Sequence, residues 1–297
     1  MFPANGRNSR GSEPTVSVVI PHKGPSETLE RCLTSLRNQA FDPSDYEVIV
    51  VINEAPNLGA HHKVASNHHV LWCEDYFSYA ARNMGISRSN GEIIAFIDSD
   101  AIAEPNWLSE GVRHIKGGSD IVAGQVELFF EKRPLTAAAC YEKLYAFDQP
   151  KNLNAGRAPT VNLFVRRETF YSCGPFDERA ESGEDFRWTS AAIQAGHKLA
   201  FAPSALVNHP ARETLQEVLL KAYRVSRGYL SSVPRDSPSP LSTLWSRGSA
   251  GLRPSLQRRA TAGLREKLLA NIVLVAVVAT KLGVVAQAMW TRAKVRK

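Results

Sequence analysis

The sequence predicts an α/β fold built on a parallel sheet, and three apolar runs support this prediction. Two of them, residues 15–20 (TVSVVI) and 47–52 (EVIVVI), enclose a helical pattern, and the third is residues 93–97 (IIAFI). A strand, a helix and a strand within about forty residues indicate a right-handed parallel unit. Ligands of such sheets bind outside the carboxyl ends of the strands, so we expect the functional site at that edge.

The first strand and the helix after it have boundaries that can be read from the residues. Pro21 halts the β-branched run, because proline cannot donate to a strand ladder. Ser26 is a suitable N-cap for the next helix, in which apolar residues recur with a 3.6-residue period. These apolar positions are Leu29, Cys32, Leu33, Leu36 and Ala40.

The remaining elements follow the same hydrophobic patterns. We expect further strands at residues 70–73, 121–130, 160–165 and 199–202. We expect helices at residues 77–87, 137–147 and 215–229, one that begins near Pro105, and one that ends at Ala195. His209 then falls in a loop that ends at Pro210, just beyond the last strand.

Composition divides the chain into four expected parts. Residues 1–13 are polar and contain no apolar stretch typical of a secretory signal, so we expect a disordered tail. Residues 14–230 carry the strand and helix patterns of a catalytic domain. Residues 231–263 are rich in Pro, Ser and Arg, which is typical of a linker. Residues 264–297 form a hydrophobic helix flanked by basic residues.

The charge of the chain indicates an anionic partner. The formal net charge is +7, with a pI near 9.3. No zinc-finger spacing, aromatic-rich RNA-binding signature or basic heptad zipper accompanies this charge, so we expect no nucleic acid partner. A sugar nucleotide or an acidic lipid surface fits better. The four cysteines lie far apart in the sequence and include no Cys-x-x-Cys motif. We therefore expect buried thiols in a reducing compartment.

Asp98 and Asp100 come directly after the apolar run at residues 93–97. Side chains two residues apart on an extended chain point the same way, so both carboxylates can lie on one side of the strand end. Two close carboxylates repel each other unless a proton or a cation lies between them, and hard oxygen ligands suit Mg²⁺ or Mn²⁺. The alternative is that Asp98 caps a turn and Asp100 is solvated. The position after a buried strand favours the metal site.

Five motifs occur in the order typical of family 2 glycosyltransferases of the GT-A type, which the chain resembles over residues 15–230. They are VSVVIPHKG (16–24), a second strand that ends in polar residues, AARNMGI (80–86) shortly before IIAFIDSD (93–100), GPFDE (174–178) and GEDFRW (183–188). Each motif is weak alone, and the five in register are specific. The resemblance implies an α/β, Rossmann-like nucleotide-sugar-binding domain with a mixed, mostly parallel sheet and a C-terminal helical extension. It also implies transfer with inversion at the anomeric carbon.

The resemblance also implies roles for individual residues. It makes Asp185 the catalytic base, with Glu184 as the second catalytic acid of the pair, and Asp100 the main ligand of Mg²⁺ or Mn²⁺. Asp98 would contact the ribose or the water shell of the metal, and His209 would add a metal or diphosphate contact. The donor would be a nucleotide-diphospho-sugar, with UDP favoured and GDP or dTDP open. Its expected binding residues are Pro21, His22, Lys23, Asn53, Glu54, Arg82, Asn83, Asp98 and Ser99.

Simpler explanations exist for several of these residues. Glu184 and Asp185 would favour the dipole at a helix N-terminus, and Arg82 with Asn83 could form a helix-surface pair. His209 could be a hydrogen-bonded loop histidine. For Asp185 the chemistry favours the functional interpretation, because an attacking hydroxyl needs a carboxylate base within reach. Asn53-Glu54 stands where the family usually has Asp-Asp or Asp-Asn, which leaves the recognised base open.

Two other functions are consistent with parts of the sequence. A nucleotidyltransferase would share the metal and the nucleotide, but it needs a longer Gly-rich phosphate loop than His22-Lys23-Gly24. A non-catalytic sugar-nucleotide-binding scaffold is supported only by Asn53-Glu54. Processive polysaccharide synthases of the family carry a Gln-x-x-Arg-Trp motif after the base, and no such motif follows Asp185. We therefore expect a hexosyltransferase that moves one sugar to a hydroxyl acceptor, lipid-linked or part of a cell-envelope glycan.

The C-terminal hydrophobic segment, residues 268–290, is long enough to cross a hydrocarbon core of about 30 Å. Lys281 near its middle opposes insertion by about 2.5–3.5 kcal/mol, and basic residues flank both ends. A helix that lies on an anionic membrane surface keeps this charge next to acidic lipid. The alternative is a soluble helix packed on the catalytic domain. We therefore expect residues 264–297 to attach the enzyme to the cytoplasmic face of the cell membrane, as a peripheral or single C-terminal segment.

Overall fold

The structure is a computed structural model, and it describes residues 14–54, 68–75, 77–231 and 254–295. The expected tail at residues 1–13 and most of the expected linker lie outside the described residues. The chain forms two compact units. The first unit comprises residues up to 127 with 149–179 and 184–209, and the second comprises residues 128–148, 180–183 and 210–297.

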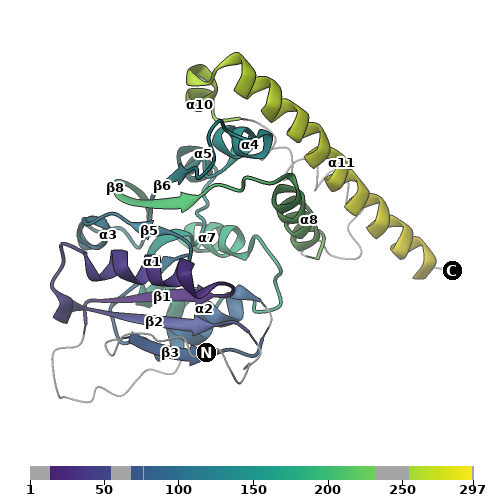
Figure 1. Cartoon of the computed structure of the whole chain (residues 1–297). Coiled ribbons are helices and arrows are strands. Elements are labelled where there is room, and N and C mark those ends of the chain that lie inside the picture. Colours follow the sequence, from purple (N-terminus) through teal and green to yellow (C-terminus); the bar gives the residue numbers. More distant parts are fainter. Residues whose placement is uncertain (1–13, 55–67, 76, 232–253, 296–297) are drawn as a thin grey trace. The chain divides into compact units, whose positions relative to one another are not determined.

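The first unit is built on an eight-stranded sheet with the order β3-β2-β1-β4-β7-β6-β8-β5 (Figure 1). Four neighbouring strands are parallel: β1 (Val16–His22), β2 (Tyr46–Ile52), β3 (His68–Trp72) and β4 (Ile93–Ile97). The rest make the sheet mixed, because β7 (Asn162–Arg166) is antiparallel to β4 and β6 (Ile121–Phe129), and β5 (Ile102–Ala103) is antiparallel to β8 (Leu199–Pro210). The predicted mixed, mostly parallel sheet is confirmed.

The strands at the centre of the sheet are apolar because both of their faces are covered. All five residues of β4 are buried, as are the last five of β2. The helices of the first unit are α1 (Ser26–Arg37), α2 (Ser78–Arg88), α3 (Trp107–Lys116), α5 (Gln149–Asn154), α6 (Arg167–Cys173) and α7 (Glu184–Gln194), with a 3-10 turn at Pro43–Asp45. Continuous apolar runs are expected of strands buried in this way.

Among the boundaries that differ from the sequence prediction, three involve residues named above. Strand β1 continues through Pro21, which pairs in register with Val51, and the next carbonyl, His22 O, accepts from Asn53 N at 2.7 Å. Helix α1 starts at Ser26 itself, and Pro25 is the capping residue, without a side-chain hydrogen bond. Strand β8 runs to Pro210, so His209 lies in a strand and not in a loop.

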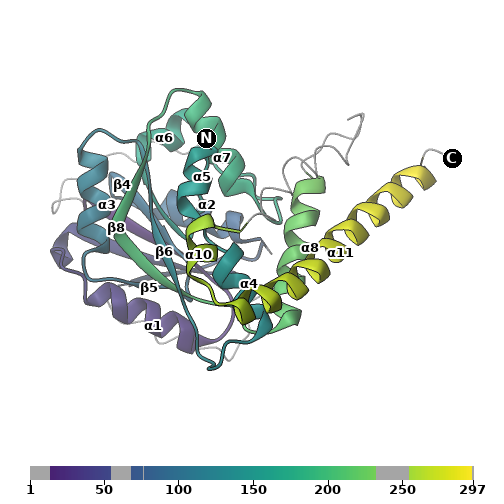
Figure 2. The ribbon, with the colours of Figure 1, turned by 90° about the horizontal axis from the view of Figure 1, so that it is seen from above.

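The second unit is helical and contains α4 (Ala137–Tyr145), α8 (Leu215–Ser231), α10 (Leu256–Thr261) and α11 (Leu264–Val295). Helices α4, α8 and α11 lie side by side in both ribbon views (Figures 1 and 2). Their shared apolar core includes Leu144 of α4, Val218 of α8, and Val273 and Val277 of α11. The helical C-terminal extension is confirmed.

Candidate active site

Polar residues gather where three parallel strands end. His22 is the last residue of β1, Asn53 follows β2, and Asp98 follows β4. Because β1 pairs in parallel with both β2 and β4, these three ends lie at the same edge of the sheet. The chain turns directly after β4, where Ala101 N donates to Asp98 O at 3.0 Å. The turn presents Asp98, Ser99 and Asp100 at this edge.

Asp98, Asp100 and His209 form a group whose ligand atoms all lie within 4.8 Å of one another. His209 reaches it from β8, because the neighbouring Asn208 pairs with Ile102 of β5. The imidazole Nε2 lies 3.3 Å from Asp100 Oδ1; the histidine side chain is 4% exposed and that of Asp100 is 41% exposed. Two carboxylates and one imidazole, partly open to solvent, suit a divalent cation that keeps some waters. These residues fit Mg²⁺ or Mn²⁺.

Arg82 neutralises one carboxylate of this group. Its guanidinium Nη2 donates to Asp98 Oδ1 at 2.9 Å, and its Nη1 donates to Ser78 Oγ at 2.9 Å. The arginine is buried, at 5% exposure. A buried guanidinium needs a carboxylate partner, and the pair fixes Asp98 on the side of α2. Arg82 is therefore part of the site and not half of a helix-surface pair.

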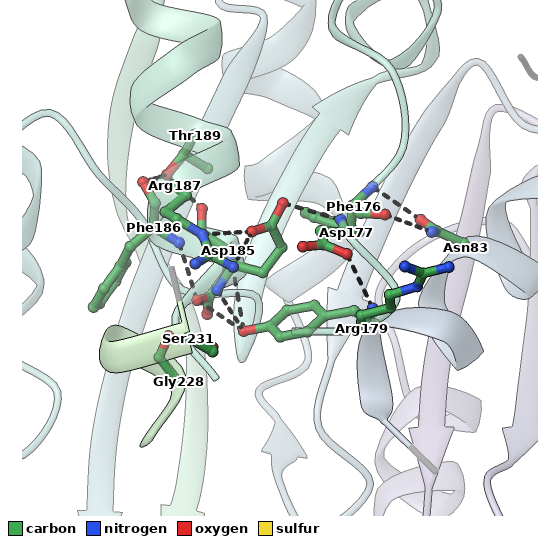
Figure 3. A network of polar contacts seen from close by, with 12 residues as sticks. Asn83, Phe176, Asp177, Arg179, Asp185, Phe186, Arg187, Thr189, Gly228 and Ser231 are labelled. Atoms are coloured by element: carbon green, nitrogen blue, oxygen red, sulfur yellow. Dashed lines mark hydrogen bonds and ion pairs between the residues drawn. The ribbon is translucent and has the colours of Figure 1, made fainter. Parts of the chain in front are cut away.

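Asp185 stands at the start of α7 with both carboxylate oxygens held. Its Oδ1 accepts hydrogen bonds from Tyr79 Oη at 3.1 Å and Phe186 N at 3.0 Å. Its Oδ2 accepts from Thr160 N at 3.2 Å. Burial raises the pKa of Asp185 above the usual range, while Arg82 and these hydrogen bonds oppose that rise. The carboxylate is thus oriented and made a stronger base than a solvated aspartate (Figure 3).

The Tyr79 hydroxyl connects this carboxylate to the backbone of α7. It accepts from Glu184 N at 3.1 Å and from Asp185 N at 3.4 Å. These are amides of the first turn, which have no partner within the helix. The Tyr79 ring also lies 5.4 Å from the guanidinium carbon of Arg82. Helix α2 therefore contacts both acidic groups, Asp98 through Arg82 and Asp185 through Tyr79.

Glu184 has structural partners. Its carboxylate accepts from Asp177 N at 3.0 Å and forms an ion pair with Arg187 at 2.6 Å. It is also buried, at 8% exposure. These contacts hold the turn that contains Asp177 against α7 (Figure 3). Glu184 thus holds this turn, whereas the carboxylate of Asp185 accepts the three hydrogen bonds described above.

The Asn83 side chain binds the same turn. Its Nδ2 donates to Phe176 O at 2.9 Å and its Oδ1 accepts from Phe176 N at 3.1 Å (Figure 3). The same Nδ2 also donates to Glu178 Oε1 at 3.1 Å. Phe176 is fully buried among rings, with Tyr79 at 5.7 Å and Trp188 at 5.3 Å between centroids. The cluster packs α2 against α7. Asn83 and the GPFDE motif thus fix the distance between Tyr79 and Asp185.

The other predicted donor-binding residues lie at the carboxyl edge of the sheet. His22 Nδ1 is 3.0 Å from Ser99 Oγ, which ties the end of β1 to the turn after β4. Glu54 Oε1 accepts from Gly24 N at 2.8 Å, and Asn53 donates to the backbone of Asp75. Pro21 is half-buried and Lys23 is exposed. These contacts shape the loop after β1.

Sequence reasoning missed Tyr79 and Thr160, which hold the Asp185 carboxylate. Tyr79 lies three residues before Arg82 on α2, so the two side chains share a helix face. That spacing could have identified Tyr79. Thr160 contributes only its backbone N–H, which any residue except proline supplies, so its side chain gave no signal.

Solved structures share this architecture. The mannosyltransferase PcManGT from Pyrobaculum calidifontis, in complex with GDP-Man and Mn²⁺, aligns with a TM-score of 0.56 at 15% identity, over 96% of this chain and 87% of that one. GalNAc-T7 with UDP, GalNAc and Mn²⁺ aligns with a TM-score of 0.54 at 17% identity, over 80% and 55% of the two chains. The fold is that of the GT-A glycosyltransferases.

Residues 17–170 match the profile of glycosyl transferase family 2. The chain is 37% identical over 225 residues to glycosyltransferase AglE of Haloferax volcanii, which covers 73% of each protein. It is 27% identical over 242 residues to the pre-mycofactocin glycosyltransferase of Mycobacterium tuberculosis, covering 76% of this chain and 49% of that protein. The chain belongs to glycosyl transferase family 2 and is a glycosyltransferase.

Proposed function

We propose that this enzyme transfers one sugar, with inversion, from a nucleotide-diphospho-sugar to a hydroxyl acceptor, in a reaction that depends on Mg²⁺ or Mn²⁺. The observation that carries the proposal is the double contact of α2. Arg82 binds Asp98 of the candidate metal group, and Tyr79 binds Asp185. A donor diphosphate site and a base are thereby held by one helix.

In this mechanism Asp185 is the general base. It accepts the proton of the acceptor hydroxyl as the oxygen bonds to the anomeric carbon, and the bond from that carbon to the diphosphate oxygen breaks. Attack from the face opposite the leaving group inverts the anomeric centre. Three hydrogen bonds to its carboxylate keep Asp185 in one orientation, which is the condition for efficient proton transfer.

The leaving nucleoside diphosphate would lie near Asp98, Asp100 and His209. A bound Mg²⁺ or Mn²⁺ would offset the negative charge that develops there. Asp98 is paired with Arg82, whereas Asp100 is the more exposed carboxylate and lies 3.3 Å from His209, so Asp100 would be the principal ligand. His22 and Ser99 would border the nucleotide, with Asn53 and Glu54 at the end of β2. Mn²⁺ in the two structural neighbours supports this assignment.

The second unit would attach the enzyme to the cytoplasmic face of the membrane. Helix α11 is long and apolar enough to cross a bilayer between Leu264 and Thr291. Attachment on that face would fit a lipid-linked or cell-envelope acceptor, because sugar nucleotides are made in the cytosol. In this proposal, residues 264–297 bind the anionic membrane surface.

A binding screen tests the proposed donor. Purified protein is titrated with UDP-, GDP- and dTDP-sugars, each with Mn²⁺ and each with excess chelator. At least one nucleotide sugar should bind only when the cation is present, with UDP-sugars as the leading candidates. A protein that binds none of them, or binds them equally in chelator, would refute metal-dependent donor binding.

The role of Tyr79 gives a prediction about pH dependence. The Tyr79→Phe variant keeps the ring but removes the hydrogen bond that stabilises ionised Asp185. The pKa of Asp185 should therefore rise further, and the acid limb of the transfer rate, measured against pH at saturating donor, should move to higher pH. Donor affinity should change less than about threefold, because Arg82 still binds Asp98. If the acid limb stays at its wild-type position, the Tyr79 hydroxyl does not influence the pKa of the catalytic base.

A further inference from the structure

Helix α11 is apolar on two opposite faces. One face is buried and includes Ala270, Val273, Val277 and Val284. The other is exposed and is called here the outer stripe: Leu268, Ile272, Val275, Leu282, Met289 and Trp290. Apart from the adjacent Met289 and Trp290, both sets recur at intervals of three, four or seven residues, so each forms a row along the helix.

The buried face is covered by α4 and α8. Val273 and Val277 pack in one core with Leu144 of α4 and Val218 of α8. Lys143 of α4 also forms an ion pair with Glu266 in the first turn of α11, at 2.8 Å. These contacts bind α11 lengthwise to the second unit, so the helix is not free on both sides.

Helices α4 and α8 carry charges that are buried or partnered within the second unit. Glu142 of α4 is 1% exposed and forms ion pairs with Arg212 at 3.0 Å and with Lys221 of α8 at 3.5 Å. If α11 crossed a bilayer in this arrangement, these groups would enter the hydrocarbon core beside it. If α11 left them behind, the apolar core of the second unit would open. The first route is costly because it places charged groups in hydrocarbon. The second is costly because it exposes apolar side chains to water.

The outer stripe offers lipid a continuous apolar surface. Its members are 45–70% exposed, with Val275 at 70% and Trp290 at 62%. From residue 268 to 290 the sequence contains one charged residue, Lys281, which is half-buried and lies apart from the stripe. Apolar rows of this length on a protein surface mark interaction sites.

Charge complementarity identifies the partner as an anionic bilayer. Arg259 and Arg265 are exposed where α11 begins, and Arg292, Lys294, Arg296 and Lys297 follow the stripe in the sequence. The acidic residue of α11, Glu266, is already paired with Lys143. Basic residues at both ends of an apolar row are typical of helices that lie at the boundary of headgroups and acyl chains.

We propose that α11 lies in the plane of an anionic membrane, with the outer stripe in the acyl boundary and α4 and α8 on its aqueous side, and does not cross the bilayer. This inference deepens the membrane attachment proposed above and rests on it. It specifies which face of α11 contacts lipid and on which side both ends of the helix lie.

Flotation with vesicles tests the lipid-facing stripe. The full chain is mixed with vesicles of phosphatidylcholine alone or with about 30 mol % phosphatidylglycerol, the acidic component. The Val275→Glu variant places a charge in the stripe, and Gln287→Glu places the same charge at an exposed position outside it. Binding to acidic vesicles should fall about tenfold or more for Val275→Glu and less than twofold for Gln287→Glu. Equal loss in both variants would overturn the assignment of the stripe.

Labelling from one side tests the in-plane orientation. The variants Gly263→Cys and Thr291→Cys are each bound to sealed vesicles and then treated with a membrane-impermeant maleimide. Labelling of the wild-type protein gives the background. Both ends should react equally, because both would lie on the outer side. Protection of Thr291→Cys alone would show that α11 crosses the bilayer.

A second copy of the chain is the competing occupant of the stripe. In that case wild type would be a dimer that does not float with vesicles, and Val275→Glu would be a monomer by sedimentation, which would overturn the proposal. The proposed enzyme function is tested by a separate measurement, the cation-dependent binding of a nucleotide sugar in the absence of vesicles. Loss of flotation with intact donor binding contradicts the membrane inference alone.

Discussion

Replacing Asp185 by asparagine should lower transfer at saturating donor by about 10²-fold or more, while the affinity for the nucleotide sugar stays close to that of wild type. Asparagine is nearly isosteric with aspartate and cannot take up a proton at neutral pH. The candidate metal group of Asp98, Asp100 and His209 does not include Asp185, so the donor site should be unaffected. Steady-state rates and equilibrium donor binding, measured on the same preparation, check both halves of this expectation.

The matched control is Asp45→Asn, the same chemical change at an exposed position in the 3-10 turn. Its rate should equal that of wild type within about twofold. A normal rate in Asp185→Asn, or a collapse of its donor affinity with unchanged transfer from bound donor, would remove Asp185 from the role of base. The aromatic cluster around Phe176 should keep the fold of the variant intact, which a thermal melt can verify.

Replacing Asp100 by alanine should abolish donor binding that depends on Mn²⁺, and with it turnover. Asp100 is the more exposed carboxylate of the group and lies 3.3 Å from His209, so its loss removes one of the two carboxylate ligands of the group. The fold should persist, because removing one of two adjacent carboxylates also relieves their repulsion. Titration calorimetry with Mn²⁺ and the nucleotide sugar provides the measurement.

The comparison variant for Asp100→Ala is His209→Ala, which removes the nitrogen ligand of the same group. Donor binding should weaken in His209→Ala and be lost in Asp100→Ala if the aspartate is the main ligand. Full activity of Asp100→Ala, or unchanged wild-type activity in excess chelator, would contradict the cation assignment. Melting temperatures of the two variants, taken without added cation, separate a lost ligand from a damaged fold.

Local patterns in the sequence determine the centre of the sheet and the acidic turn after it. The runs that form β1, β2 and β4 are apolar because these strands are buried, and Asp98 and Asp100 interrupt one of them abruptly. Their adjacency to a strand end could therefore be predicted. The identity of the fold could be predicted from five motifs in register, which the family match and the structural neighbours confirm.

Contacts between distant segments were beyond local patterns. Residues 199–202 look like a complete short strand, which predicts a loop at His209, but β8 continues in register with β5. Only the pairing of Asn208 with Ile102 brings the histidine to Asp100. Likewise, the sequence showed Glu184-Asp185 as an acidic pair. The ion pair with Arg187 and the bond from Tyr79, which give the two residues different roles, depend on tertiary packing.

The central claim is that a divalent cation binds at Asp98, Asp100 and His209 together with the donor diphosphate. Anomalous scattering from a crystal grown with Mn²⁺ and the nucleotide sugar tests it most directly. We expect one strong peak within roughly 2.0–2.5 Å of a carboxylate oxygen of Asp100 and of the donor diphosphate. A donor bound with no peak at this turn, or a peak bound to other residues, would contradict it.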